Sequence, residues 1–229
     1  TTGDENVAVG YAALDAEDTG TGNVAIGRNA LTAQNADTNN YNTAVGYIAG
    51  AAVTTGVFNT LIGGLAGDAL TDADNNVAVG TSALTADTLG SKSTAIGRSA
   101  LANQNFTSAT DSYNTAVGHQ AGFNITTGRF NSILGAAAGD AITTGDQNTA
   151  IGYQALSANQ TSNNNVAVGY QALRLNTAAN NVAVGVEAMD ANTSGQQNTA
   201  VGREALNANT ESDGGVAVGY RALKSNTTG

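Results

Sequence analysis

Asn148–Leu156 reads N-T-A-I-G-Y-Q-A-L, and Asn165–Leu173 reads N-V-A-V-G-Y-Q-A-L one repeat later. The motif and its closing glycine return thirteen times along the chain, and most copies lie seventeen residues apart. The glycines are Gly10, Gly27, Gly46, Gly63, Gly80, Gly97, Gly118, Gly135, Gly152, Gly169, Gly185, Gly202 and Gly219. A short period over the whole chain predicts stacked structural repeats and argues against a globular domain with a single pocket.

Each repeat begins with a short apolar run and then becomes polar. Val7-Ala8-Val9 alternates with period two, which is typical of a strand, and we expect the aliphatic residue before the glycine to face the core. The glycine indicates a bend with positive φ or a close backbone approach. An Ala-Leu pair after it predicts a second short strand, and the Asn, Thr, Asp, Ser and Gly residues that remain predict loops.

These features predict an all-β protein, namely a parallel β-solenoid of about thirteen 17-residue coils. Because one period runs from end to end, we expect a single domain over residues 1–229. The asparagine that opens each motif, such as Asn59 or Asn76, predicts a ladder of amide hydrogen bonds that Ser93 and Gly215 interrupt. The alanine three residues after each glycine predicts the tightest packing position.

Four repeats have glycine where the others have leucine or methionine, and an aliphatic residue follows three positions later. The pairs are Gly50 with Val53, Gly67 with Leu70, Gly122 with Ile125, and Gly139 with Ile142. We expect the side chain that fills the core to move along these coils. They occur two at a time, which indicates a longer unit of four coils.

Gly3 and Gly229 occupy the same phase of the repeat, and no capping sequence is evident at either end. Solenoid ends normally need caps. We therefore expect an excerpt of a longer array, or ends that stack on other subunits.

The composition excludes several functions. Only 11% of residues are charged and the formal net charge is -10, which argues against nucleic acid and against an anionic membrane surface. No apolar run reaches the roughly 18 residues of a membrane span, so we expect no membrane insertion. Cysteine is absent, so the chain has no disulfide or thiolate metal site.

We expect no enzyme and no cofactor. His119 is the only histidine, and no nucleophile motif accompanies it. Neighbouring carboxylates such as Asp15, Glu17 and Asp18 lie in predicted turns, where solubility explains them. The glycine pattern of calcium-binding β-rolls is missing, so no metal site is predicted either.

Two sets of residues are candidates for recognition. The first is the position directly after the glycine, where aromatic rings and cations suit stacking on sugars or on partner chains. Its members are Tyr11, Arg28, Tyr47, Arg98, His119, Tyr153, Tyr170, Arg203 and Tyr220. The second is a pair of lengthened turns, Asn35–Tyr41 and Asn103–Tyr113, since insertions in repeats map to one side and often bind. Their candidate residues are Asn39, Asn40, Tyr41, Phe106, Asp111 and Tyr113. The alternative for the first set is a solvated or subunit-packing ladder, and the alternative for the second is neutral loop growth.

The motif at Asn148–Leu156 and Asn165–Leu173 resembles the head repeats of YadA-type trimeric autotransporter adhesins, and equally those of some phage tail fibres. The resemblance covers essentially the whole chain. It implies a left-handed parallel β-roll, three chains side by side, and an extracellular fibre on a cell surface or virion. The period is longer than in adhesin heads, and the neck, stalk and anchor of adhesins are not in this sequence.

The leading prediction is therefore a structural and adhesive fibre module for surface or host attachment, with a homotrimer or an end-to-end homopolymer as its assembly. A cell-surface glycan or a protein is the candidate receptor. The alternative is a self-assembling extracellular filament or sheath subunit. Ice binding is a third reading, because β-solenoids can present flat threonine arrays, but a threonine column on the same face as core residues argues against it.

Overall fold

The computed structural model describes residues 3–36 and 39–227. Gly229, whose phase in the repeat is used above, lies outside the described residues, as do residues 37–38 of the first lengthened turn. Within the described residues there are strands and turns but no helix, and the strands of successive coils pair in parallel. The predicted all-β parallel β-solenoid is confirmed. The chain divides into two compact units after Asn114. Each is a solenoid by itself, and the single domain over 1–229 stays a prediction.

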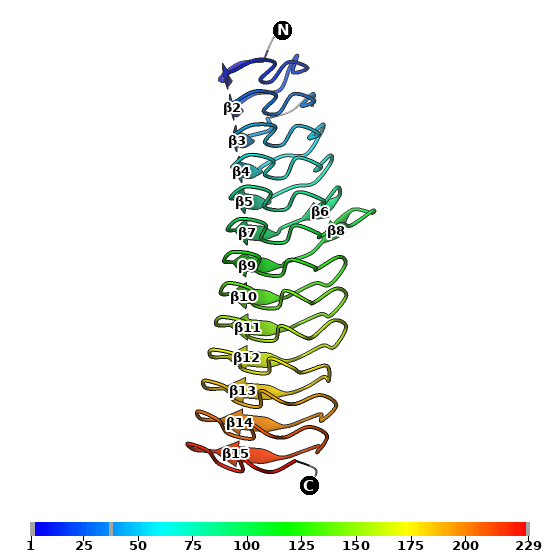
Figure 1. The fold of residues 1–229 in the computed structure, drawn as a ribbon. Coiled ribbons are helices and arrows are strands. Elements are labelled where there is room, and N and C mark those ends of the chain that lie inside the picture. The colour runs from blue at the N-terminus through cyan, green and yellow to red at the C-terminus, as the bar shows by residue number, and fades with distance from the viewer. Residues whose placement is uncertain (1–2, 37–38, 228–229) are drawn as a thin grey trace. The chain divides into compact units, whose positions relative to one another are not determined.

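The first unit has six strands of a parallel sheet among its described residues, one from each coil. They are β1 (Val7–Val9), β2 (Val24–Ile26), β3 (Thr43–Val45), β4 (Thr60–Ile62), β5 (Val77–Val79) and β7 (Thr94–Ile96). A separate parallel pair joins β6 (Gly90–Ser91) to β8 (Thr110–Asp111). Figure 1 shows β8 projecting beyond the coils of the first unit.

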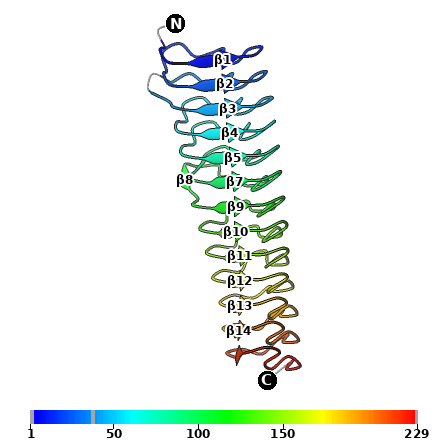
Figure 2. The same ribbon diagram turned by 90° about the vertical axis from the view of Figure 1, so that its left-hand side faces the viewer.

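The second unit repeats this arrangement without a projecting pair. Its strands follow one another in chain order, and Figure 2 shows them aligned one above the next. They are β9 (Thr115–Val117), β10 (Ser132–Leu134), β11 (Thr149–Ile151), β12 (Val166–Val168), β13 (Val182–Val184), β14 (Thr199–Val201) and β15 (Val216–Val218). The register never slips, so each motif position forms a column along the unit.

The glycine after each strand is required by the backbone. Gly63 has a φ of 135°, and a Cβ built on it would lie 2.6 Å from the carbonyl carbon of Gly80 in the next coil. Both facts confirm the predicted bend and close approach. The predicted second strand is wrong. Leu156 and Gln154 have φ values of 56° and 52°, so the Ala-Leu segment is a turn with two left-handed residues.

The core is thinner than the sequence suggested. Ala150 and Leu156 are completely buried, whereas Ile151, the aliphatic residue before the glycine, is exposed. The expectation that this aliphatic residue faces the core is wrong, because the alanine between the two larger residues points inward. Packing explains the reversal. In coils such as this one the leucine of the turn already fills the narrow interior, which leaves room for only a methyl group on the strand.

The alternative core side chains behave as predicted. Val53, Leu70, Ile125 and Ile142 are all completely buried in the four coils that lack the leucine. A Cβ built on Gly67 would lie 2.8 Å from Leu70 Cδ1, so the two positions fill the same space. The alanine three residues after the glycine is also completely buried in the interior coils, as Ala66 and Ala155 are.

The asparagine ladder is confirmed, and its bonds run from backbone to side chain. Asn59 donates its backbone N–H to Asn42 Oδ1 at 2.8 Å, and Asn76 donates to Asn59 Oδ1 at 2.9 Å. Asn59 Nδ2 donates to the carbonyl of Ala73 at 2.7 Å. Each amide thus satisfies backbone groups that the narrow coil would otherwise bury unpaired. Ser93 donates its backbone N–H to Asn76 Oδ1 but has no side-chain amide of its own, so it interrupts the ladder as predicted.

Candidate recognition surface

The Tyr/Arg column, defined as the residues directly after the glycines, lies at the start of each turn. Its tyrosines are half-exposed or more, from 46% at Tyr170 to 75% at Tyr11. In the first unit the Arg28 guanidinium carbon is 5.8 Å from the ring centroids of both Tyr11 and Tyr47. In the second unit Tyr153 and Tyr170 stack with centroids 5.8 Å apart. Neighbouring members therefore do form ladders.

The column is not a continuous stripe, however. Gly64 and Thr81 separate Tyr47 from Arg98 in the first unit. In the second unit Ala136 lies between His119 and Tyr153, and Val186 lies between Tyr170 and Arg203. The candidate residues are therefore brought together in short groups, with small or apolar residues between them.

Arg203 belongs to a different kind of cluster. Its guanidinium lies 3.3 Å from the carboxylate of Glu204, which also pairs with Arg221 at 2.9 Å and with Lys224. The Glu204 side chain is almost completely buried among these cations. Hydrogen bonds from Lys224 and Arg221 lower the pKa of Glu204 to about 2. This arginine is thus engaged in an ion-pair network next to Tyr220, whose ring stacks under Arg221.

The first lengthened turn, Asn35–Tyr41, is attached to the preceding coil by a buried carboxylate. Glu17 Oε2 accepts a hydrogen bond from Asn40 Nδ2 at 2.9 Å, and Glu17 Oε1 accepts from the backbone of Gly20 at 2.6 Å. Asn39, in contrast, is exposed and donates to the Tyr41 hydroxyl at 3.2 Å. The Tyr41 ring stacks on Phe58 with centroids 5.8 Å apart. The turn therefore has a fixed, hydrogen-bonded conformation at its described residues.

The second lengthened turn, Asn103–Tyr113, is held in the same way. Asp87 is completely buried, and its Oδ1 accepts the backbone N–H of Phe106 at 3.0 Å. Its Oδ2 accepts from Gln104 Nε2 at 2.6 Å. Gln104 also joins this carboxylate to Asn114 of the asparagine ladder. Phe106 is itself buried, so this candidate residue anchors the turn and is not available at the surface.

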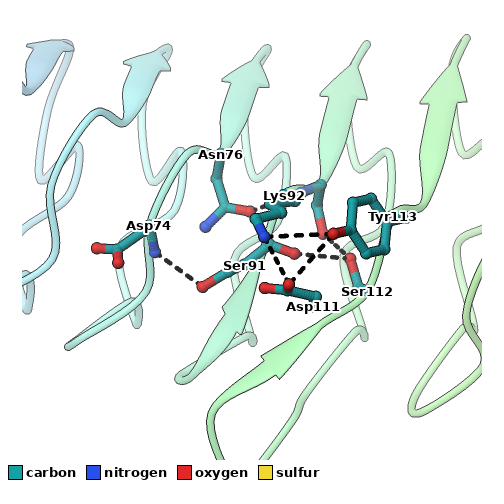
Figure 3. Close-up of polar contacts among 8 residues, drawn as sticks. Asp74, Asn76, Ser91, Lys92, Asp111, Ser112 and Tyr113 are labelled. Carbon is teal, nitrogen blue, oxygen red and sulfur yellow. Dashed lines mark hydrogen bonds and ion pairs between the residues drawn. The ribbon is translucent and has the colours of Figure 1, made fainter.

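The same turn also contributes to an exposed cluster of Lys92, Asp111 and Tyr113, whose polar ends point toward one another in Figure 3. Lys92 Nζ lies 2.5 Å from Asp111 Oδ2, and the Tyr113 hydroxyl donates to the same oxygen at 3.2 Å. The ammonium is also 5.2 Å from the Tyr113 ring centroid. The hydrogen bond between the two charged groups raises the pKa of Lys92 and lowers that of Asp111. The cluster is a polar surface feature built by two successive coils.

The two candidate sets lie at opposite ends of the strands. Tyr41 precedes β3 and Tyr47 follows it, so the outward face of the strand separates them. The sequence pattern predicts that the residues on that face lie in the core, which is wrong. They now form two exposed or half-exposed columns of Val, Ile, Leu, Thr and Ser, illustrated by Leu134, Ile151 and Val184.

Sequence reasoning missed the roles of Glu17 and Asp87. Glu17 was explained by solubility, which is wrong because its side chain is buried and accepts hydrogen bonds from two coils. A signal was present. Both acids stand seven residues after a glycine, in a column that elsewhere holds Asn, Gln or an aliphatic residue. A carboxylate only accepts hydrogen bonds, so it suits a place where the next coil supplies donors.

Among the described residues, no group of three or more His, Asp or Glu side chains is arranged to hold a metal ion. In the same part of the chain no helix is long and apolar enough to cross a membrane. Comparison with known proteins adds no assignment: no protein-family model, curated protein or solved structure matches this chain.

Proposed function

We propose that the chain is a non-enzymatic module of an extracellular attachment fibre, on a cell surface or a virion, in which copies associate side by side. The observation that carries this proposal is the outward face of the strands. In the second unit it presents Leu134 and Ile151, residues that are 50% and 36% exposed, in register with Val184 and Val201. A contiguous apolar patch of this kind marks an interaction site.

The chemistry of the face favours a second copy of the chain as its partner. Its two columns contain no charged residue in any described strand, so like faces can meet without charge repulsion. Because the coils of every copy have the same spacing, each column of one copy can lie alongside the same column of a second copy. Three copies, the number implied by the resemblance to trimeric adhesin heads, would enclose all three faces.

The surface outside that face supports attachment. Its tyrosines, arginines and anchored turns vary from coil to coil, whereas the strand and core positions hardly change. Repeat proteins commonly divide the work in this way, with an invariant scaffold and variable residues for binding. A cell-surface glycan or a protein is the proposed receptor.

Adhesion tests the proposal. The purified chain is coated on beads and incubated with a panel of cultured bacterial and animal cells and with immobilised extracellular proteins. Saturable attachment to at least one surface supports an attachment module. Binding no stronger than that of beads coated with an unrelated acidic protein contradicts it. Electron microscopy addresses the alternative, because indefinite polymers favour a filament or sheath subunit over a discrete fibre module.

The outward face of the strands also favours ice binding as a second candidate function. Thr149 and its column lie on the outward face of the strands at the coil spacing of about 4.8 Å, and the buried alanines lie on the other face. A regular, flat array of threonine and valine can order water. Thermal hysteresis in the purified chain would favour this function, and freezing at the equilibrium melting point would eliminate it.

A further inference from the structure

Gly64 interrupts the Tyr/Arg column at a place where the backbone does not require glycine. A Cβ built on Gly64 would have one neighbouring atom within 4 Å, the carbonyl oxygen of Tyr47 at 3.9 Å. Its neighbour Gly63 differs completely, because a Cβ there would lie 2.6 Å from Gly80. A Cβ thus fits at position 64 without a clash, and the glycine leaves open space beside the preceding coil.

The space lies next to the ring of Tyr47. Leu65 donates its N–H to the Tyr47 carbonyl at 2.9 Å, and Ser82 donates to the Gly64 carbonyl at 3.0 Å. These bonds place positions 47, 64 and 81 one above another in consecutive coils. Arg28 comes from the coil before Tyr47 and covers the ring from that side. Position 64 lies one coil further on and has no side chain, so no ring or cation from that position stacks on Tyr47.

The other unit shows what ordinarily fills such a space. Tyr153 and Tyr170 occupy the same column in consecutive coils, and their rings stack at 5.8 Å with an angle of 18° between planes. One coil step therefore accommodates one flat ring on a tyrosine. The small residue also recurs, because Ala136 stands before Tyr153 at the position of the four-coil unit that corresponds to Gly64.

We propose that the side of Tyr47 facing Gly64 binds a neutral pyranose ring, with the exposed hydroxyl of Thr81 hydrogen-bonding to the sugar. The apolar C–H face of a pyranose stacks on aromatic rings, and its rim carries hydroxyls. Positions 64 and 81 bring no charge, and the chain has a net charge of -10, so a neutral sugar is favoured over an anionic one. The inference rests on the proposed attachment function and names the class of its receptor.

Affinity at one such site is low, since a single stacked ring and one hydroxyl supply little interaction energy. Repetition compensates for this. In the second unit Tyr153 adjoins Ala136 in the same column, and this place and the further copies in an assembled fibre offer several stacking sites to one cell surface. Linked weak sites bind far more tightly together than singly. A weak pyranose site is therefore compatible with firm attachment.

Saturation-transfer NMR tests the proposal with the methyl pyranosides of glucose, galactose, mannose and N-acetylglucosamine, each added separately to the full chain. We expect saturation of the C–H protons of at least one sugar. Gly64→Tyr, which adds a ring in the geometry of Tyr153 and Tyr170, should reduce that signal at least fivefold when Ala136→Tyr is introduced with it. Gly64→Ala is the matched control and should retain the signal, because Ala136 already occupies the corresponding position.

A second variant tests the same site without the added bulk that could disturb folding. Tyr47→Ala removes the stacking surface without adding bulk and, combined with Ala136→Tyr, should also lose the signal. Absence of saturation for all four sugars, or a signal unchanged in the tyrosine variants, overturns the proposal. So does saturation of an aromatic peptide in place of the sugars, which would indicate a protein receptor. A chain that still attaches to cells under those results loses this inference but keeps the proposed function.

Discussion

Gln104 donates its side-chain amide to the carboxylate of Asp87 one coil earlier, with 2.6 Å between Nε2 and Oδ2. Both side chains are completely buried, and the same carboxylate accepts the N–H groups of Gly90 and Phe106 at 3.0 Å. Three donors thus converge on a group that can only accept. This contact fixes the longest turn of the chain to the coil beneath it.

Asp87→Asn should loosen that turn. The new amide places N–H groups against donors, which leaves a buried hydrogen bond unmade at a cost of about 1–3 kcal/mol. Hydrogen exchange at the Phe106 amide is the appropriate measurement, because repeat arrays open locally. We expect faster exchange there than in Glu211→Gln, a control that neutralises an exposed acid. Equal protection in both variants would show that the carboxylate does not hold the turn.

A glycine that ends a strand and a glycine directly after such a position should respond differently to alanine. Gly135 has a φ of 140°, and a Cβ on it would lie 2.5 Å from the carbonyl oxygen of Gly152. Gly135→Ala should therefore lose at least about 2 kcal/mol, from strain and forced separation of coils. Gly64→Ala should be nearly neutral. Urea unfolding of both variants checks this. Similar midpoints would contradict the conclusion that only the strand-ending glycine packs closely against the next coil.

The pH dependence of stability should report on Glu204. Its pKa is about 2 in the folded protein and 4.5 ordinarily, so the folded state favours the carboxylate. The stabilisation is complete above the ordinary value and is lost as the pH falls from 4.5 toward 2. Carboxyl carbon NMR measures the titration directly. The difference in stability between the wild type and Glu204→Gln should shrink over that interval, and a difference constant with pH would exclude the ion-pair network.

Asp140 should behave in the reverse sense. One of its carboxylate oxygens is buried without a hydrogen-bond partner, and burial raises its pKa. The folded state therefore favours the protonated acid, and stability falls as the pH rises through the ordinary value of 3.8 and on through the raised one. Asp140→Asn should raise the Tm at neutral pH and change it little in acid. A lower Tm at neutral pH would mean that the charged carboxylate of Asp140 stabilises the folded protein.

The repeat itself was predictable because it appears directly in the residues. A fixed period, a strand of alternating residues and a glycine that cannot be replaced are local features, and each was interpreted correctly. Which strand face is buried was not predictable from Val-Ala-Val alone. Hydrophobicity favours the valines as core, and only the narrowness of the coil, already filled by residues such as Leu156, reverses that choice.

The candidate sites were predicted in position more than in detail. The Tyr/Arg column and described residues of both lengthened turns lie at the surface, but the candidates Asn40 and Phe106 are buried and Arg203 is paired with Glu204. Those differences depend on contacts between coils, which adjacent sequence does not reveal. The anchors Glu17 and Asp87 could have been found by reading their column down the alignment of repeats, where an acid is exceptional.

The central claim, that copies of this chain associate through the outward strand face, is tested most directly by sedimentation equilibrium at micromolar concentration. We predict a mass of more than one chain, three if the arrangement is that of adhesin heads. Ile151→Lys with Val168→Lys, which places charges on that face, should reduce it to the mass of one chain. A wild type that sediments as a single 22.7 kDa chain would contradict the claim.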